Sequence, residues 1–280
     1  MKYINFTKMA GAGNDFIVVD NRLGVIKHKA AGKLAKKLSD RRFSIGADGL
    51  ILLEKSSAIG GSASGRKKAD IRMRILNPDG SEAEMCGNGV RCLAKFAVDH
   101  RITGPKLSIE TPAGTIYAEV RGDFVKAKML EPKDLRLNFE IRVNGHKELL
   151  SFVNTGVPHA VKRVDSVSNC DVEGLGGTIR HHEHFAPRGT NVDFVSLRKG
   201  NAIDIRTYER GVEGETLACG TGSTAAALVT AATKNLKSPV QVHTKGGESL
   251  KVYFSKTGVR FHDVYLEGRI QKSFEGRIEL

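Results

Sequence analysis

Two cysteine–glycine tetrapeptides are the residues of this chain whose types and spacing could do acid–base chemistry. Cys86-Gly87-Asn88-Gly89 and Cys219-Gly220-Thr221-Gly222 each stand directly before a segment that is typical of a buried helix. A thiol at a helix N-terminus meets the positive end of the helix dipole and unpaired backbone N–H groups, which lower its pKa. We therefore expect a thiolate that can act as a base or as a nucleophile.

The residues after each cysteine could hold an anion. The glycines let the backbone approach a ligand, and the N–H groups of Gly87, Asn88, Gly220 and Thr221 are suited to a carboxylate. If two halves of the chain face each other, one thiolate could take a proton from a carbon while the other thiol delivers one to the opposite face. Stereochemical inversion would follow. The alternative is that both cysteines are small packing residues at tight turns.

An internal repeat favours the catalytic interpretation. At the separation of the two cysteines, residues 107–111 match residues 240–244, and Gly114 matches Gly247. Residues 70–72 match residues 204–206 with a one-residue slip, and residues 14–16 loosely match residues 191–194. The chain is thus predicted to consist of two homologous halves, each a sheet wrapped around one helix.

The elements that must position these motifs are mostly short strands with alternating apolar residues, such as residues 72–76 and 107–111. Helical patterns are few and cover residues 30–39, 90–98 and 223–233. A Ser/Gly-rich segment, residues 56–65, is predicted to be a loop.

Composition excludes several classes of protein. The chain has 280 residues, of which 40% are hydrophobic and 27% charged, so neither a disulfide-stapled miniprotein nor a disordered chain is expected. Apolar runs are too short to span a membrane and the N-terminus lacks a secretory pattern, which makes the cytoplasm the expected location. The four cysteines should then be free thiols, with Cys92 and Cys170 serving packing.

The formal net charge of +13 raises a rival from another class, a non-enzymatic binder of an acidic polymer. The basic residues are spread along the chain, and aromatic residues make up only 6% of it, which is few for stacking on bases. We therefore expect no nucleic-acid partner.

Seven segments together resemble the diaminopimelate epimerase family over essentially the whole chain. They are residues 13–16, 77–82, 85–91, 156–159, 190–194, 208–211 and 218–222. The resemblance implies a cofactor-independent enzyme that interconverts LL- and meso-2,6-diaminopimelate, on the route to lysine and peptidoglycan precursors. It also implies a homodimer and a fold of the α/β (α+β) class with two pseudo-symmetric domains, each a mainly antiparallel sheet around a central buried helix. The expected domains are residues 1–130 plus 268–280, carrying Cys86, and residues 131–267, carrying Cys219.

The same resemblance assigns roles to residues at a site between the domains. Cys86 and Cys219 would be the catalytic acid/base pair, and His159 and Glu209 would tune their protonation. The substrate-binding residues would be Asn14, Asn77, Gly87, Asn88, Asn191, Glu209, Arg210, Gly220 and Thr221. Arg210, Asn77 and Asn191 would hold the distal carboxylate, for which a guanidinium and amides are suited.

The chain departs from the family pattern at two positions. Val157 stands where many members have Asn, and Gly49 stands where some have Gln. Neither change touches the cysteines, so the class of reaction is the safer part of the expectation.

Three other patterns need an interpretation. His181, His182 and His184 have a superficially metal-like spacing, but no matching ligand cluster stands out, and no metal is expected. Residues 11–13, Gly-Ala-Gly, are only a fragment of a dinucleotide fingerprint and precede a strand-like segment. Within the enzyme class, the nearest rival is a proline or hydroxyproline racemase.

Overall fold

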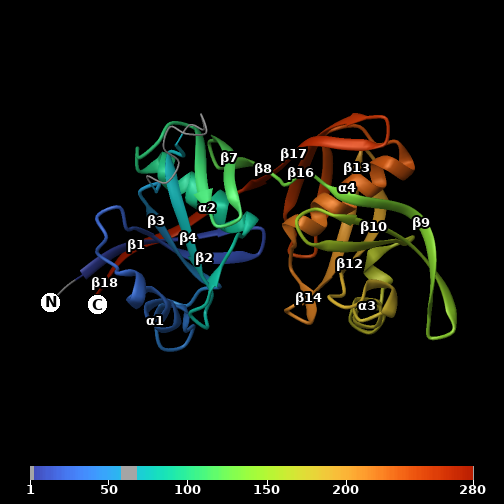
Figure 1. The fold of residues 1–280 in the computed structure, drawn as a ribbon, viewed down its shortest axis with the longest axis horizontal. Coiled ribbons are helices and arrows are strands. Elements are labelled where there is room, and N and C mark those ends of the chain that lie inside the picture. Colours follow the sequence, from blue (N-terminus) through green and yellow to red (C-terminus); the bar gives the residue numbers. More distant parts are fainter. Residues whose placement is uncertain (1–2, 58–67, 280) are drawn as a thin grey trace. The chain divides into compact units, whose positions relative to one another are not determined.

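The chain folds into two compact units, each with its own sheet and helices. The computed structural model describes residues 3–57 and 68–279. Unit 1 comprises Met1–Ala127 and Gly268–Leu280, and unit 2 comprises Lys128–Glu267, so the first boundary falls slightly before residue 130. Both units combine strands with few helices, which confirms the predicted α/β class (Figure 1). Of the predicted Ser/Gly-rich loop, residues 58–65 lie outside the described residues.

Unit 1 is a mainly antiparallel sheet with one helix on each face. Its helices are α1 (His28–Ser39) and α2 (Gly87–Asp99). Its strands are β1 (Tyr3–Gly11), β2 (Asn14–Asp20), β3 (Gly49–Glu54), β4 (Ile71–Leu76), β5 (Glu82–Ala83), β6 (Lys106–Thr111), β7 (Gly114–Arg121), β8 (Phe124–Lys128) and β18 (Gln271–Glu279). They pair in the order β18–β1–β2–β3–β4–β6–β7–β8 with β5 also on β4, and only β2–β3 and β4–β6 are parallel.

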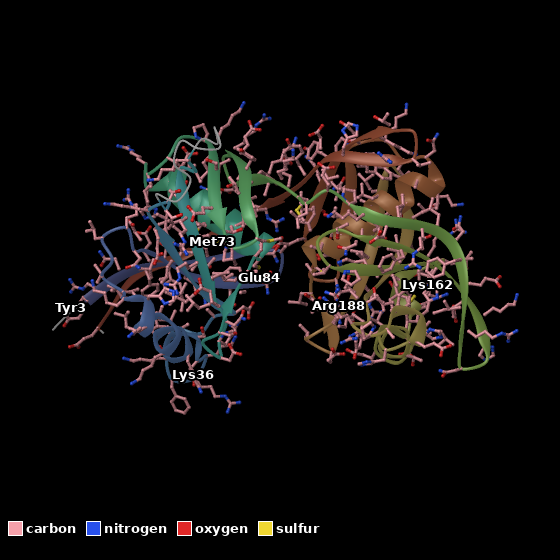
Figure 2. All side chains as sticks on the ribbon, in the orientation of Figure 1. Tyr3, Lys36, Met73, Glu84, Lys162 and Arg188 are labelled. Carbon is pink, nitrogen blue, oxygen red and sulfur yellow. The ribbon has the colours of Figure 1, made fainter. Side chains whose placement is uncertain are left out.

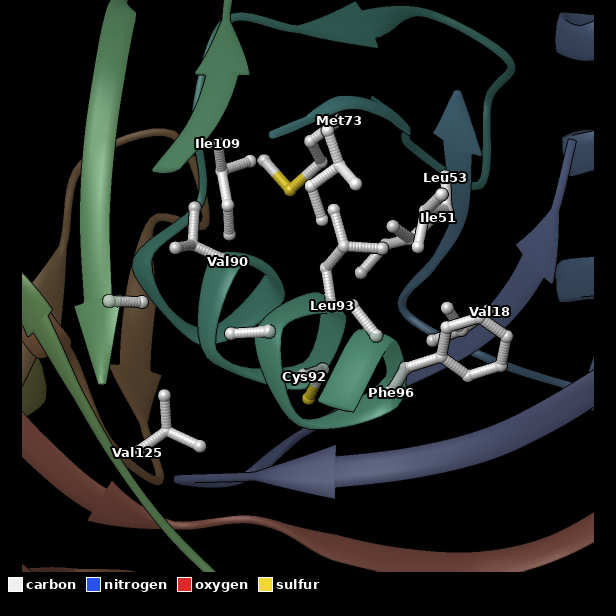
Figure 3. Packing of buried hydrophobic residues seen from close by; sticks show 14 of the residues in the cluster. Val18, Ile51, Leu53, Met73, Val90, Cys92, Leu93, Phe96, Ile109 and Val125 are labelled. Carbon is white, nitrogen blue, oxygen red and sulfur yellow. The ribbon is translucent and has the colours of Figure 1, made fainter. Parts of the chain in front are cut away.

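Alternation along β3 explains why helices cover both faces of this sheet. Leu50 and Leu52 pack in the cluster that contains the apolar side of α1, whereas Ile51 and Leu53 pack against α2. Figure 3 shows the second cluster, with Leu93 and the other buried residues of α2 facing strand residues. A continuous apolar run such as that of β3 is typical of a strand buried on both faces.

Charged side chains lie mainly outside these clusters. Lys36 is exposed on α1 and points away from unit 1, whereas Met73 of β4 lies in its interior (Figure 2). The described residues contain no helix long and apolar enough to cross a membrane.

Unit 2 is built in the same way. Its helices are α3 (Val172–Arg180), α4 (Gly220–Lys234) and the short 3₁₀ turns η1 (Val167–Asn169) and η2 (Glu183–Phe185). Its strands are β9 (Lys133–Val143), β10 (His146–Asn154), β11 (Pro158–Arg163), β12 (Asn191–Arg198), β13 (Ala202–Glu209), β14 (Gly214–Thr216), β15 (Val240–Thr244), β16 (Ser249–Thr257) and β17 (Arg260–Arg269). They pair in the order β9–β10–β11–β12–β13–β15–β16–β17 with β14 also on β13, and only β11–β12 and β13–β15 are parallel.

The two orders match strand for strand, with β18 of unit 1 in the place of β9 of unit 2. The registers match as well: Phe16 pairs with Gly49 in parallel, as His159 pairs with Asn191. Ile51 lies opposite Ile75, as Asp193 lies opposite Thr207. Each position of one central sheet thus has an equivalent in the other.

This register corrects two of the repeat matches made from the sequence. Ile71 pairs with Ile109 as Ile203 pairs with Val242, so the equivalent of Ile71 is Ile203 and not Ile205. Residues 14–16 begin β2, whose counterpart is β11 and not β12. The turns between the strands differ in length in the two units, so short segments with similar residues do not lie at equivalent positions.

Equivalent ion pairs brace the approach to each cysteine. Arg74 of β4 binds Glu82 of β5 through two hydrogen bonds of 2.9 and 2.7 Å. Arg206 of β13 binds Glu215 of β14 in the same fork at 2.6 and 2.8 Å. A bidentate pair fixes both partners in one plane, and in each unit it holds the short strand that leads to the cysteine helix.

Candidate functional site

Cys86 is the N-cap of α2. The Gly89 N–H donates to Cys86 Sγ at 3.5 Å, and the thiol is half-buried. Gly87 and Asn88 form the first turn with Gly89, where an α-helix offers no backbone acceptor of its own. Unit 1 therefore presents a thiol and two helix-end N–H groups together.

The side chain of Asn88 links this turn to Asn14. Asn88 Nδ2 donates to Asn14 Oδ1 at 2.7 Å, and Asn88 Oδ1 accepts from the fully buried Arg91 at 2.6 Å. Asn14 Nδ2 in turn donates to Asp48 at 3.0 Å. These contacts run from a cation to a carboxylate, so the orientation of both amides is determined.

Asn77 occupies the turn just after β4, where its amide donates to Ser81 Oγ at 2.9 Å. Its neighbours in sequence, Pro78 and Asp79, are exposed. The structure thus groups Asn14, Asn88 and the start of α2, while Asn77 lies at the end of a strand with contacts inside its own turn.

Cys219 is the N-cap of α4 in the equivalent place. The Gly222 N–H donates to Cys219 Sγ at 3.4 Å, and the hydroxyl of Thr221 lies 3.3 Å from the same sulfur. Gly220 and Thr221 form the first turn, and the carbonyl of Thr221 accepts from Thr155 at 3.0 Å. This thiol is buried, with 7% of the residue exposed.

Burial raises the pKa of the Cys219 thiol, and the negative charges of Glu209 and Asp193 raise it further. The hydrogen bonds from Thr221 and Gly222 oppose this effect but do not outweigh it. The expectation of a lowered pKa at a helix N-terminus is therefore wrong for Cys219, because desolvation and like charge dominate the helix end. Cys219 is a protonated thiol at neutral pH in this state.

His159, Asn191 and Arg210 form a connected group on β11, β12 and the end of β13. The Arg210 N–H donates to Asn191 Oδ1 at 2.7 Å. Asn191 Nδ2 donates to the carbonyl of Pro158 at 3.1 Å and lies 3.5 Å from His159 Nε2. The Arg210 guanidinium is half-buried and donates to the carbonyl of Arg188 at 3.4 Å.

Glu209 lies close enough to both His159 and Cys219 to interact electrostatically with each of them. Burial raises the pKa of its carboxyl, with a smaller contribution from Asp193, while the hydrogen bond from Thr216 lowers it. The structure thus brings together the unit 2 residues that the sequence predicted.

Asp193 is the buried residue that the sequence reasoning missed. It lies two residues after Asn191, on the same face of β12, and binds His159 Nδ1 at 2.8 Å. The alternation of Asn191 and Asp193 in a strand was visible, and it could have placed both carboxamide and carboxylate on the face toward α4.

The two departures from the family pattern have clear structural settings. Val157 precedes β11 and is partly exposed, with its carbonyl accepting from the Thr155 N–H at 3.2 Å. At Gly49 an added Cβ would lie 2.8 Å from the carbonyl oxygen of Leu76. A side chain there would require the strands to shift.

The three histidines make separate contacts. His182 Nε2 lies 3.0 Å from the carbonyl of Arg142, His184 stacks on Phe139, and His181 lies 3.4 Å from Glu213. Across residues 3–57 and 68–279, no group of three or more His, Cys, Asp or Glu could hold a metal ion. Ala12 and Gly13 form the tight turn between β1 and β2, with positive φ angles of 50° and 82°.

Comparison with solved structures defines the class of fold. The chain resembles a PhzF-family phenazine biosynthesis protein from Bacillus anthracis with a TM-score of 0.74 at 17% identity, covering 100% of both chains. It also resembles a probable proline racemase from Agrobacterium radiobacter K84, with a TM-score of 0.66 at 16% identity over 99% of this chain and 93% of that one. The chain therefore has the two-domain α/β fold of the PhzF and proline racemase proteins.

The sequence comparisons give the family. A family model described as diaminopimelate epimerase matches residues 6–133 and 151–267. The diaminopimelate epimerase of Aquifex aeolicus is 42% identical over 284 residues, which cover 98% of each chain, and that of Methanocella arvoryzae is 41% identical over 292 residues. The chain belongs to the diaminopimelate epimerase family and is an enzyme of the isomerase class, an epimerase.

Proposed function

We propose that this enzyme interconverts LL- and meso-2,6-diaminopimelate without a cofactor, by two-base proton transfer between Cys86 and Cys219. The observation that carries the proposal is the repeated arrangement of the two thiols. Each is the N-cap of a buried helix, and each Sγ accepts from the N–H of a glycine three residues on. Family membership supports the substrate.

In the proposed reaction, one cysteine thiolate takes the proton from the α-carbon of the substrate. The electron pair left on that carbon delocalises into the adjacent carboxylate, whose growing charge the helix-end N–H groups stabilise. The other cysteine, as a thiol, then delivers its proton to the opposite face. The two cysteines exchange protonation states, and the configuration of the carbon is inverted.

The buried Cys219 thiol suits the role of proton donor in the unliganded enzyme, because its raised pKa keeps it protonated. Cys86 would then be the first base. For the reverse reaction Cys219 must be a thiolate. A substrate ammonium close to Glu209 would lower the pKa of Cys219 by offsetting the charge of the Glu209 carboxylate.

The distal end of the substrate would be held by Arg210, Asn191 and Asn77. Arg210 offers a partly exposed guanidinium, and Asn191 already binds its backbone. A buried site built for a second carboxylate and ammonium should reject substrates that lack them, because its polar groups would be left unpaired.

A steady-state assay with LL-diaminopimelate tests this proposal. The wild-type enzyme should form the meso isomer, and Cys86→Ser and Cys219→Ser should each lower kcat at least about 100-fold, since each removes an acid/base group. Cys92→Ser, which changes a buried thiol of α2 away from its first turn, is the matched control and should retain activity. Activity on proline, but none on diaminopimelate, would overturn the substrate assignment, and salt-sensitive polyanion binding without either activity would favour the non-enzymatic rival.

The proposal extends to the setting of the enzyme. We place it in the biosynthesis of lysine and peptidoglycan precursors, as a cytoplasmic homodimer, on the strength of the family resemblance. Sedimentation equilibrium would test the dimer, and a monomer at micromolar concentration would refute it.

A further inference from the structure

Three buried polar side chains lie beneath the first turn of α4. His159 comes from β11, Asp193 from β12 and Thr207 from β13, three strands that are adjacent in the sheet. His159 and Asp193 are fully buried, and Thr207 is 3% exposed. Burying polar groups is unfavourable unless they bind one another.

Asp193 is the centre of this group. Its Oδ2 lies 2.8 Å from His159 Nδ1, and its Oδ1 accepts from the Thr207 hydroxyl at 2.8 Å. It also touches the helix, since a Cβ added at Gly222 would lie 2.5 Å from Asp193 Oδ1. The carboxylate therefore contacts the same turn whose N–H binds Cys219 Sγ.

The hydrogen bonds around Asn191 determine which nitrogen of His159 carries the proton. The backbone N–H of Arg210 is always a donor, so the side-chain atom of Asn191 that it faces is the amide oxygen, Oδ1. The Asn191 NH₂ group then faces His159 Nε2 at 3.5 Å, and two donors do not face each other. This arrangement favours Nε2 as the acceptor and Nδ1 as the nitrogen that donates its proton to Asp193.

Unit 1 provides an internal comparison. The positions equivalent to His159, Asp193 and Thr207 are Phe16, Ile51 and Ile75, all buried and apolar. There, a Cβ added at Gly89, the counterpart of Gly222, would meet Ile75 and Ile51 at 2.9 and 3.2 Å. The fold accepts an apolar trio beneath a cysteine helix, so structure alone does not require the polar one.

We propose that Asp193 is a positioning residue of the Cys219 half-site. This name covers Cys219 and the unit 2 residues His159, Asn191, Glu209 and Arg210. Asp193 holds His159 as the neutral tautomer with the proton on Nδ1, and it places a buried negative charge beneath the turn that carries Cys219. The two units differ in this respect, because Ile51 of unit 1 stands at the position equivalent to Asp193 and carries no charge. The consequence for turnover rests on the proposed function, whereas the tautomer and the charge do not.

The titratable groups beneath the start of α4 are His159 from β11, Asp193 from β12 and Glu209 from β13. The helix itself carries no charged residue before Lys234. Both carboxylates raise the pKa of Cys219, in agreement with their place beneath it. Removal of one of them should therefore favour the thiolate.

Long-range ¹H–¹⁵N spectra of the wild-type enzyme at pH 7.5 test the tautomer, with His159→Gln used only to assign the signal. We expect a neutral ring with a protonated Nδ1 and an unprotonated Nε2. A proton on Nε2, in either a neutral or a cationic ring, would overturn the proposal, and this measurement needs no variant of Asp193 to fold.

The pH dependence of iodoacetamide labelling tests the charge, with the rate at each cysteine read by peptide mass spectrometry. In Asp193→Asn the apparent pKa of Cys219 should fall by about one pH unit, which raises its labelling rate below that pKa about tenfold. Cys86 in the same molecules is the internal control and should be unchanged. Thr207→Val, which keeps the carboxylate, should leave the profile of Cys219 close to that of the wild type.

An unchanged Cys219 profile in a folded Asp193→Asn variant would overturn the proposal. If the proposed function holds, kcat for the conversion of LL-diaminopimelate should rise about threefold with KM changed less than about threefold, because a thiol of lower pKa that is still protonated is a stronger acid and the carboxylate grip is unchanged. Absence of epimerase activity in the wild type would refute the proposed function and leave the labelling and tautomer results to decide this inference separately.

Discussion

At the level of single residues, the two cysteine environments differ in charge and burial. Cys219 is buried above Asp193 and close to Glu209, whereas the strand positions beneath the start of α2 are apolar. Glu209 itself follows this logic, since its carboxyl is partly desolvated and its pKa is raised. In unit 2 the carboxylates of Glu209 and Asp193 therefore disfavour a thiolate at Cys219, and a cationic group of the substrate could offset their charge.

Glu209→Gln should make the folded enzyme more stable at neutral pH. A carboxyl whose pKa is higher in the folded state binds protons more readily there, so its contribution to stability falls as pH rises above its unfolded pKa. The melting temperature of Glu209→Gln should exceed that of the wild type at pH 7 to 8, and the difference should shrink toward pH 4. Calorimetry across this range checks the result, and a variant that is less stable at pH 8 than at pH 4, relative to wild type, would contradict it.

Sequence reasoning selected candidate residues by their type and motif, including both cysteines, His159 and Arg210, and their catalytic and binding roles stay predictions. It missed Asp193 because its partners, His159 and Thr207, come from two other strands, and pairing registers are not visible in a single sequence. The lowered thiol pKa was inferred from the helix end alone, whereas burial of Cys219 is a property of the tertiary structure.

At the level of elements, the cysteine helices begin over a sheet at very close range. An added Cβ at Gly89 or Gly222 would lie 2.9 or 2.5 Å from a strand side chain, and each glycine also donates its N–H to a cysteine. What lies beneath them differs: the methyl ends of Ile75 and Ile51 in unit 1, and a buried carboxylate in unit 2. The same substitution should therefore have different effects in the two units.

Gly222→Ala should destabilise the enzyme by about 1–3 kcal/mol, because its Cβ would displace the hydrogen-bonded Asp193 carboxylate. Gly89→Ala should cost less, since the tips of isoleucine side chains can move and alanine favours a helix by about 1 kcal/mol over glycine. Urea unfolding of the two variants provides the comparison. Equal losses, or a larger loss for Gly89→Ala, would show that Asp193 is free to move.

Helices α1, α2 and α4 could be predicted from apolar patterns, and each extends only slightly beyond the predicted residues. Helix α3 could not, because Gly174, Gly176 and Gly177 lower its intrinsic helix propensity. Tertiary packing overrides this low propensity. Gly176 lies against Tyr208, and a Cβ added at Gly176 would lie 2.8 Å from the Cβ of Tyr208. A glycine in this helix is what its close approach to β13 requires.

At the level of the whole molecule, the chain is two copies of one strand order. The C-terminal strand β18 pairs with β1 and completes the sheet of unit 1, in the place that β9 holds in unit 2. The repeat of the cysteine motif in the sequence is thus the visible part of a repeat in topology. A pair of half-sites of like geometry and unlike charge fits a reaction that needs an acid and a base.

The central claim is that a proton leaves one face of the α-carbon to one cysteine and a different proton arrives at the other face from the second. The direct measurement is the deuterium content of product and remaining substrate early in the reaction of LL-diaminopimelate in D₂O. Two bases predict a meso product deuterated at the inverted carbon, because its proton comes from a thiol equilibrated with solvent, and remaining substrate that keeps its protium. A meso product that retains the substrate's own proton would show a single base serving both faces and would contradict the account.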